Sequence, residues 1–228
     1  MSTARDRILA SIRDGLLRAQ LPADVEPREH RSLPFAPAMS PAAMVEQFTA
    51  ALAALTGHVH RAAAASDVAG IVARIAGGNG AVSYLSWDDE HLGCPALVAD
   101  LASRGLARVE YDVPDQPGAR AHELEELAAV GLGLTGAHAG IAENGALVLV
   151  SGPGRGRLVS LLPPVHVAIL REDRVRPSLA AVIREEPGLL GAGSNVVMIA
   201  GPSRTADIEM TLTHGVHGPK AMYVILTP

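Results

Sequence analysis

The first of two glycine-rich segments, residues 131–157, carries several polar groups that a small-molecule site would use. It reads GLGLTGAHAGIAENGALVLVSGPGRGR, and its glycines allow tight turns and close approach of the backbone to a ligand. Its hydroxyl, imidazole, carboxylate and carboxamide groups supply hydrogen-bond donors and acceptors and sites for proton exchange. We predict ligand contacts at Thr135, Gly136, His138 and Asn144, with Glu143 as the candidate catalytic carboxylate. A hairpin that turns at Gly136 and at Asn144-Gly145 is the alternative interpretation.

The same segment ends in the turn GPGRGR, which follows the apolar run ALVLV. It lacks the Gly-Lys-Ser/Thr of a phosphate-binding P-loop and the spacing of a dinucleotide fingerprint. Arginine beside flexible backbone can still hold a carboxylate or phosphate through two parallel hydrogen bonds. Gly152, Gly154 and Arg155 are therefore predicted ligand contacts, and a solvated basic turn is the alternative.

The second segment, GPSRTADIE at residues 201–209, directly follows the apolar run NVVMIA. We predict that a helix begins here, capped by Ser203 or Thr205, because a hydroxyl at a helix start can accept a backbone N–H. Arg204 would then lie at the positive end of the helix, where an anion binds well. The predicted ligand contacts are Gly201, Ser203, Arg204, Asp207 and Glu209; alternatively, the charged members only pair with one another.

Histidines and the single cysteine limit the metal chemistry open to this chain. His214 and His217 are three residues apart in THGVHGPK, but the neighbouring glycines and proline disfavour a helix that would align them on one metal ion. We predict no metal site and expect a turn with hydrogen-bonded histidines at 214–217, and we expect His166 to be a buried, hydrogen-bonded core residue. Cys94 is the only cysteine, so the chain binds no cofactor through its own cysteines and cannot form an internal disulfide. No catalytic Ser-His-Asp spacing is present.

Alternating short apolar runs and helical patterns must position these residues. Strands are predicted at 58–62, 81–86, 107–111, 146–150, 165–170, 195–200 and 222–226, and helices near 41–56, 67–76, 95–103, 119–129, 156–161 and 177–184. This order predicts an α/β fold with a mostly parallel sheet and helices on both faces. In such sheets ligands bind at the carboxyl ends of the strands.

The N-terminal part of the chain differs in composition from the rest. Ile8, Ile12, Leu16 and Leu17 recur at helical spacing, and residues 21–41 then contain five prolines. We predict an N-terminal helical arm and proline-rich tether over residues 1–39, followed by the main domain over 40–228. The arm would dock either on its own body or on another subunit.

Composition narrows the classes of partner. Hydrophobic residues make up 48% of the 228 residues and aromatic residues only 3%, which suits helices packed on a sheet. The formal net charge of −5 gives no electrostatic reason to bind nucleic acid or anionic membranes. No apolar run has the length of a signal peptide core or a membrane span, so a cytoplasmic protein is expected.

Two longer stretches, TGAHAGIAENGALVLVSGPGRGRLVSLLPPVHVAIL and GPSRTADIEMTLTHGVHGPKAMYVIL, resemble the LUD domain family and its LutC (YkgG-like) lactate-utilisation branch over residues 40–228. The resemblance implies a fold like that of ribose-5-phosphate isomerase (RpiA), glucosamine-6-phosphate deaminase (NagB) and CoA-transferases. It also implies a cytoplasmic role in the oxidation of L-lactate to pyruvate, beside LutA-like and LutB-like partner proteins that carry the iron–sulfur clusters.

The resemblance also indicates which positions belong to a shared site. These are Thr135, Gly136, Glu143, Gly145, Gly152, Pro153, Gly201, Pro202, Ser203, Arg204, Asp207, Glu209, Gly215, His217, Gly218 and Pro219. Asn144 departs from the pattern, in which many relatives have threonine. Glu143-Asn144-Gly145 is similar to the stretch that carries the nucleophilic carboxylate of some CoA-transferases.

Three functions are consistent with these residues. The first is a subunit that binds a small carboxylate or a phosphate-bearing ligand while partner proteins transfer electrons. The second is a CoA-transferase-like or other acyl or sugar-phosphate enzyme that uses Glu143 as nucleophile. The third is a non-catalytic interaction or regulatory module.

Overall fold

The computed structural model describes residues 4–18, 39–206, 212–214 and 218–228, with side chains omitted for 204–206 and 212–214. The chain divides into two compact units, residues 1–35 and 36–228. Within the first, α1 (Ala4–Arg18) buries none of its residues. Its apolar residues Ile8, Leu9, Ile12, Leu16 and Leu17 are all exposed, and an ion pair between Asp14 and Arg18 joins successive turns. The predicted N-terminal helix is confirmed, whereas most of the predicted tether lies outside the described residues.

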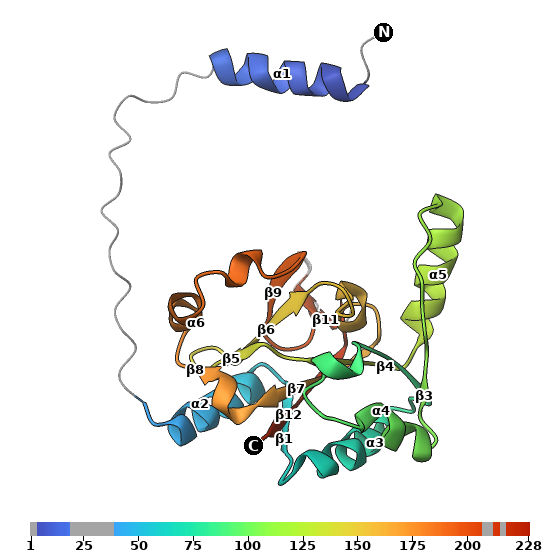
Figure 1. The fold of residues 1–228 in the computed structure, drawn as a ribbon, viewed down its shortest axis with the longest axis vertical. Helices are drawn as coiled ribbons and strands as arrows, with labels where there is room; N and C mark the ends of the chain where they lie inside the picture. The colour runs from blue at the N-terminus through green and yellow to red at the C-terminus, as the bar shows by residue number, and fades with distance from the viewer. Residues whose placement is uncertain (1–3, 19–38, 207–211, 215–217) are drawn as a thin grey trace. The chain divides into compact units, whose positions relative to one another are not determined.

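A six-stranded parallel sheet forms the centre of the second unit (Figure 1). Its order is β1 (His58–Arg61), β12 (Ala221–Thr227), β7 (Val165–Arg171), β4 (Leu132–Gly136), β2 (Ser83–Ser86) and β3 (Ala107–Arg108). In the middle of the sheet, β7 pairs with β4 from Val165↔Leu132 to Ile169↔Gly136. The predicted mostly parallel α/β fold is thus confirmed, since every pairing in this sheet is parallel.

A second, four-stranded sheet was not anticipated from the sequence. Its order is β8 (Val175–Arg176), β5 (Ala139–Ile141), β6 (Ala146–Ser151) and β9 (Asn195–Ile199). The pairs β5–β6 and β6–β9 are antiparallel, and β5–β8 is parallel. Two further short strands, β10 (Arg204–Ala206) and β11 (Leu212–His214), pair with each other. The predicted strands near 146–150 and 195–200 exist, but they belong to this second sheet.

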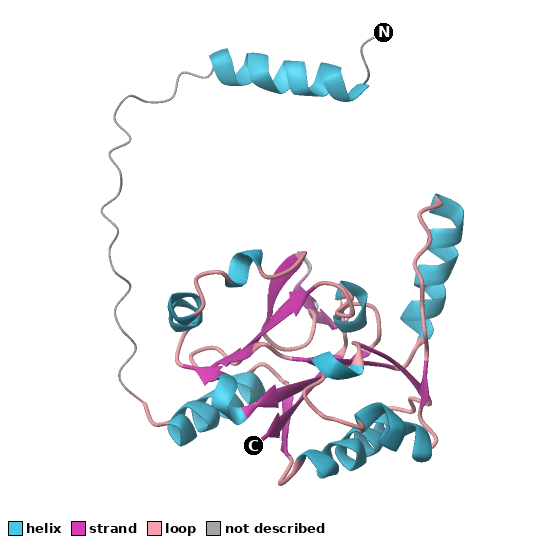
Figure 2. Ribbon diagram, viewed as in Figure 1, coloured by secondary structure: helices cyan, strands magenta, loops and turns pink. Residues whose placement is uncertain are grey.

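Helices lie beside the strands of the two sheets (Figure 2). They are α2 (Pro41–Ala54), α3 (Val68–Gly78), α4 (Leu97–Ser103), α5 (Pro117–Ala129) and α6 (Leu179–Glu185). The predicted start of α2 is confirmed, because the Ser40 hydroxyl accepts the Ala43 N–H at 3.2 Å and Pro41 begins the helix. Short 3₁₀ turns are η1 (Ala65–Asp67), η2 (Asp89–His91), η3 (Arg157–Ser160), η4 (Glu172–Arg174) and η5 (Leu189–Gly191). A helix was predicted at residues 156–161, where the structure has the 3₁₀ turn η3.

The core is aliphatic, as the composition predicts. All residues of β6 are buried, as are the first six of β7, because both faces of these strands are covered. Phe48 and Leu52 of α2 are fully buried and join the same cluster as Leu170 of β7. Within the described residues, no helix combines the length and the apolar character needed to cross a bilayer.

Candidate functional site

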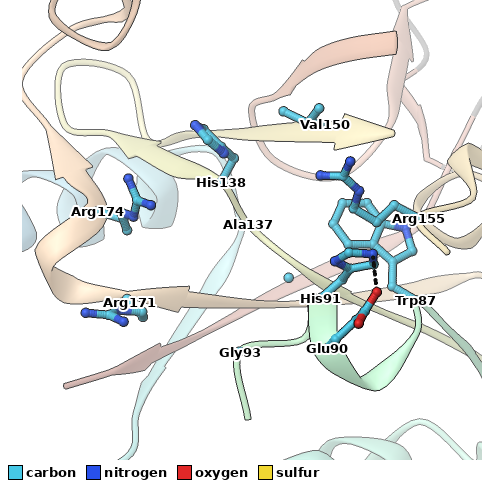
Figure 3. Close-up of a pocket in the computed structure, with 11 residues that line it drawn as sticks. Trp87, Glu90, His91, Gly93, Ala137, His138, Val150, Arg155, Arg171 and Arg174 are labelled. Carbon is cyan, nitrogen blue, oxygen red and sulfur yellow. Dashed lines mark ion pairs between the residues drawn. The ribbon is translucent and has the colours of Figure 1, made fainter. Parts of the chain in front are cut away.

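A pocket of about 350 Å³ opens at the carboxyl ends of β2, β4 and β7 (Figure 3). Trp87 follows β2 directly, Ala137 and His138 follow β4, and Arg171 is the last residue of β7. These strands are parallel neighbours, so the residues that follow them meet at one edge of the sheet. The pocket therefore lies where ligand sites of open α/β sheets occur.

One wall of the pocket carries a guanidinium group without an ionic partner. Arg155 lies on the turn after β6, which the hydrogen bonds between Gly152 and Arg155 close at 2.9 and 3.2 Å. The Gly154 carbonyl accepts the Asp88 N–H at 2.8 Å, and this bond ties the turn to the loop after β2. Arg155 Nε is buried without a hydrogen-bond partner, and Arg155 forms no ion pair within the part of the chain that the structure describes.

The opposite wall contains His138, Arg171 and Arg174, and Figure 3 shows them across the pocket from Arg155, His91 and Trp87. Unlike Arg155, both arginines are paired. Arg171 donates to Asp173 at 2.9 and 2.5 Å, and Arg174 donates to Glu186 at 3.1 Å. His138 donates from Nε2 to Glu186 at 2.8 Å, because an ionised carboxylate can only accept.

The floor of the pocket depends on a close approach between η2 and β4 at Gly136. A Cβ atom at Gly136 would lie 2.1 Å from the carbonyl oxygen of His91, which no side chain could occupy. Glycine at this position thus lets the loop that carries Glu90 and His91 close over the end of β4. Glu90 Oε1 lies 3.3 Å from His91 Nε2.

Thr135 and His166 lie in the core beside the pocket and do not line it. Thr135 Oγ1 and His166 Nε2 are 2.9 Å apart and both residues are buried, whereas His166 Nδ1 has no partner. Burial, together with the charge of Arg157, lowers the pKa of His166 to about 4. The predicted buried histidine is confirmed, with one ring nitrogen bonded. The Thr135 hydroxyl, which was predicted to contact a ligand, instead forms this internal hydrogen bond.

The turn Glu143-Asn144-Gly145 lies outside the pocket lining. It joins β5 to β6, which confirms the hairpin interpretation at Asn144-Gly145. The hairpin turn predicted at Gly136 is wrong, because the chain passes there from the central sheet to the second sheet. Asn144 Oδ1 accepts the Ala146 N–H at 3.0 Å, and Glu143 Oε1 accepts the Leu179 N–H at 3.4 Å. These side chains therefore organise the turn and do not face Arg155.

The segment after β9 lies at the amino ends of the central strands, whereas the pocket lies at their carboxyl ends. Ser203 N–H donates to the Pro219 carbonyl at 2.9 Å, and Lys220 N–H donates to the Pro164 carbonyl at 2.8 Å, so the segment adjoins the starts of β12 and β7. The predicted helix is wrong, because Arg204–Ala206 is β10, paired with β11. Gly201, Ser203 and Arg204 are thus separated from His138 and Arg155. Asp207, Glu209 and His217 lie outside the described residues.

Sequence reasoning identified Gly136, His138 and Arg155 but missed much of the lining. The missed residues are Trp87, Glu90, His91, Arg171 and Arg174, together with Glu186, which holds two side chains of the wall. The rule that ligands bind at the carboxyl ends of strands would have found Trp87 and Arg171, since each directly follows a predicted strand. Arg174 and Glu186 had no such signal, because long-range packing brings them together.

No three His, Cys, Asp or Glu side chains gather as a potential metal site in the described residues. Burial raises the pKa of the Cys94 thiol, which keeps it protonated and poorly nucleophilic. The ionisable side chains that line the pocket are three arginines, two histidines and Glu90. Arg155 has no ionic partner among the described residues, so the fold and the site define an α/β protein with a small pocket suited to an anion.

Comparison with known proteins places this α/β chain in a family. The LUD domain model matches residues 45–227, and the chain belongs to the LUD domain family. A crystal structure of a DUF162 family protein from Deinococcus radiodurans has the same fold, with a TM-score of 0.61, 21% identity, and coverage of 84% of this chain and 100% of that one.

Curated relatives match over part of their length. Lactate utilization protein C of Halalkalibacterium halodurans is 41% identical over 127 residues, covering 53% of this chain and 54% of the relative. Lactate utilization protein C of Shouchella clausii is 36% identical, with 64% and 63% covered. The uncharacterized protein YkgG of Escherichia coli is 37% identical, with 48% and 50% covered. The chain thus spans about half to just under two thirds of these relatives.

Proposed function

We propose that this chain is a ligand-binding component of a lactate-utilisation system and holds a small carboxylate, such as lactate or pyruvate, in the pocket at the carboxyl edge of the central sheet. The guanidinium of Arg155, which has no ionic partner among the described residues, carries this proposal. The names of the relatives from Halalkalibacterium halodurans and Shouchella clausii support the choice of lactate as the pathway.

The pocket has complementary groups for each part of such a ligand. Arg155 can hold a carboxylate through two parallel N–H···O bonds. Trp87 and Val150 offer apolar surface to a methyl group, and His138 and His91 can exchange hydrogen bonds with a hydroxyl or carbonyl oxygen. A phosphate-bearing ligand would use the same guanidinium and is a competing outcome of the test.

Electron transfer in the proposed system belongs to other proteins. A single cysteine cannot supply the thiolate ligands of an iron–sulfur cluster, so LutA-like and LutB-like iron–sulfur partners would accept the electrons when L-lactate becomes pyruvate in the cytoplasm. In this assignment the chain binds and orients the carboxylate. Glu143, outside the pocket lining, has no part in it.

Calorimetric titration with L-lactate, pyruvate and inorganic phosphate tests the proposal. We expect Arg155→Gln to weaken carboxylate binding roughly 10-fold to 100-fold, because a charge-assisted hydrogen bond contributes about 1.5–3 kcal/mol. Arg120→Gln, on the exposed surface of α5, is the matched control and should bind as the unchanged protein does. Preference for phosphate over both carboxylates, or full affinity in Arg155→Gln, would contradict the proposal.

A further inference from the structure

One carboxylate holds two side chains of the pocket wall. Glu186 Oε2 accepts the His138 Nε2–H at 2.8 Å, and its Oε1 accepts from Arg174 Nη1 at 3.1 Å. Glu186 directly follows α6 and does not itself line the pocket, so it acts on a ligand only through these two neighbours. The place of His138 at the pocket therefore depends on Glu186.

The same contact decides which imidazole nitrogen a ligand meets. An ionised carboxylate accepts but does not donate, so the hydrogen on Nε2 is committed to Glu186. Nδ1 is then the nitrogen left for a ligand. In the neutral ring it accepts a hydrogen bond from a hydroxyl, and in the protonated ring it donates to a carboxylate or carbonyl oxygen.

Glu186 is the negative charge beside His138. Burial alone would raise the pKa of Glu186, but the hydrogen bond and charge of His138, together with Arg174, lower it below its usual value. The carboxylate is therefore charged near pH 7, and it contacts His138 and Arg174 in that state.

The charges around the pocket give a reason for His138 to take up a proton when an anion binds. Among the described residues, the charged side chains that line the pocket, or pair with those that do, are Arg155, Arg171 and Arg174 against Glu90, Asp173 and Glu186. With His91 and His138 neutral, the three positive charges equal the three negative charges. A bound monocarboxylate adds one negative charge to this balanced set. Protonation of His138 restores neutrality at the pocket wall.

We propose that His138 is the proton-carrying residue of the pocket and that Glu186 is its positioning residue, so that a carboxylate binds together with a proton taken from solvent onto Nδ1 of His138. The inference rests on the proposed function, because it needs a carboxylate in this pocket. It gives His138, rather than Glu143, the acid–base role, since Glu143 is bonded to the start of α6.

Calorimetric titration of the full chain with pyruvate, near pH 7 in two buffers of different ionisation enthalpy, tests the proposal. The difference between the two observed heats gives the number of protons taken up on binding. We expect net uptake in the unchanged protein and its loss in His138→Asn. Glu186→Gln keeps a hydrogen-bond acceptor but removes the charge, so it should reduce proton uptake and, by linkage, make pyruvate affinity near pH 7 depend less steeply on pH.

A matched control lies one residue away. Glu185 pairs with Arg176 and not with the pocket wall, so Glu185→Gln makes the same chemical change and should leave proton uptake intact. Restored uptake in Glu186→Asp would support the positioning role. Uptake that persists in His138→Asn, or that disappears in His91→Asn instead, would overturn the inference while leaving carboxylate binding in place. No pyruvate binding to the unchanged protein would overturn the proposed function as well.

Discussion

At the residue scale, neighbouring positions of the glycine-rich segment serve different purposes. His138 and Arg155 face the pocket, whereas Thr135 and Asn144 form internal hydrogen bonds. All four side chains have the polar chemistry of a binding site, so the sequence alone could not separate them. The separation arises from strand direction, because Thr135 lies in the fully buried β4 while His138 follows the point where the chain leaves that strand.

The buried His166 gives a pH-dependent contribution to stability. Its folded pKa of about 4 is below the unfolded value, so the unfolded chain binds the extra proton first as pH falls. The native state is therefore favoured above about pH 6.5, and this advantage is lost progressively between about pH 6.5 and 4. The full difference corresponds to about 3 kcal/mol.

Denaturant unfolding at a series of pH values should show this loss in the unchanged protein and a smaller one in His166→Gln, whose amide can still bond Thr135. His122→Gln is the control, because His122 is exposed on α5. Equal pH dependence in the unchanged protein and His166→Gln would show that His166 does not account for it.

At the element scale, the sequence predicted regular strands well and glycine-rich strands poorly. The strands β6, β7 and β12 were predicted because apolar residues dominate each run. No strand was predicted at β4, whose sequence is LGLTG, although every residue of it is buried. Its glycines allow neighbouring loops to approach closely, which is a tertiary effect that a local pattern does not reveal.

The helix predicted after β9 was wrong for a related reason. Ser203, Thr205 and Asp207 have the residue types that begin a helix, and local propensity favours that outcome. The chain instead forms β10, which pairs antiparallel with β11 (Leu212–His214). Pairing between separated segments overrides local helix signals, so the predicted anion cradle lost its structural basis.

The turn at Gly145 should be among the least tolerant positions of the second sheet. Gly145 has φ of +67°, and a Cβ there would lie 2.4 Å from the backbone nitrogen of Leu52. Gly145→Ala would force the β5–β6 turn away from α2, at a cost of about 3 kcal/mol from left-handed strain and overpacking. Gly70→Ala, inside α3 with only flexible arginine ends near its added Cβ, should instead be neutral or stabilise by up to about 1 kcal/mol.

Thermal and denaturant unfolding of both variants measures the difference. A Gly145→Ala protein as stable as the unchanged one would mean that α2 and the turn can move apart without loss of packing.

At the scale of the whole molecule, the apolar core and the proposed pocket belong to one unit. In the part of the chain that the structure describes, the buried apolar residues lie between Val45 and Leu226, and the pocket residues lie between Trp87 and Arg174. α1 adds no buried residue, so its exposed leucines and isoleucines contribute none of the core's burial energy. Because the second unit has a hydrophobic core of its own, we predict that it folds stably without the first.

A chain that begins at Ala36 tests this independence. We expect its unfolding temperature to stay within about 2 °C of the full chain, since a change of 1 kcal/mol corresponds to about 2–4 °C at this size. Pyruvate affinity should also be unchanged. The full chain carrying Ile12→Glu and Leu16→Glu is the companion variant, because it removes the apolar stripe of α1 without shortening the protein. A fall of several degrees in both proteins would indicate that α1 buries this stripe on a folded partner surface, either its own body or a second copy, and dependence of that fall on protein concentration would identify the second copy.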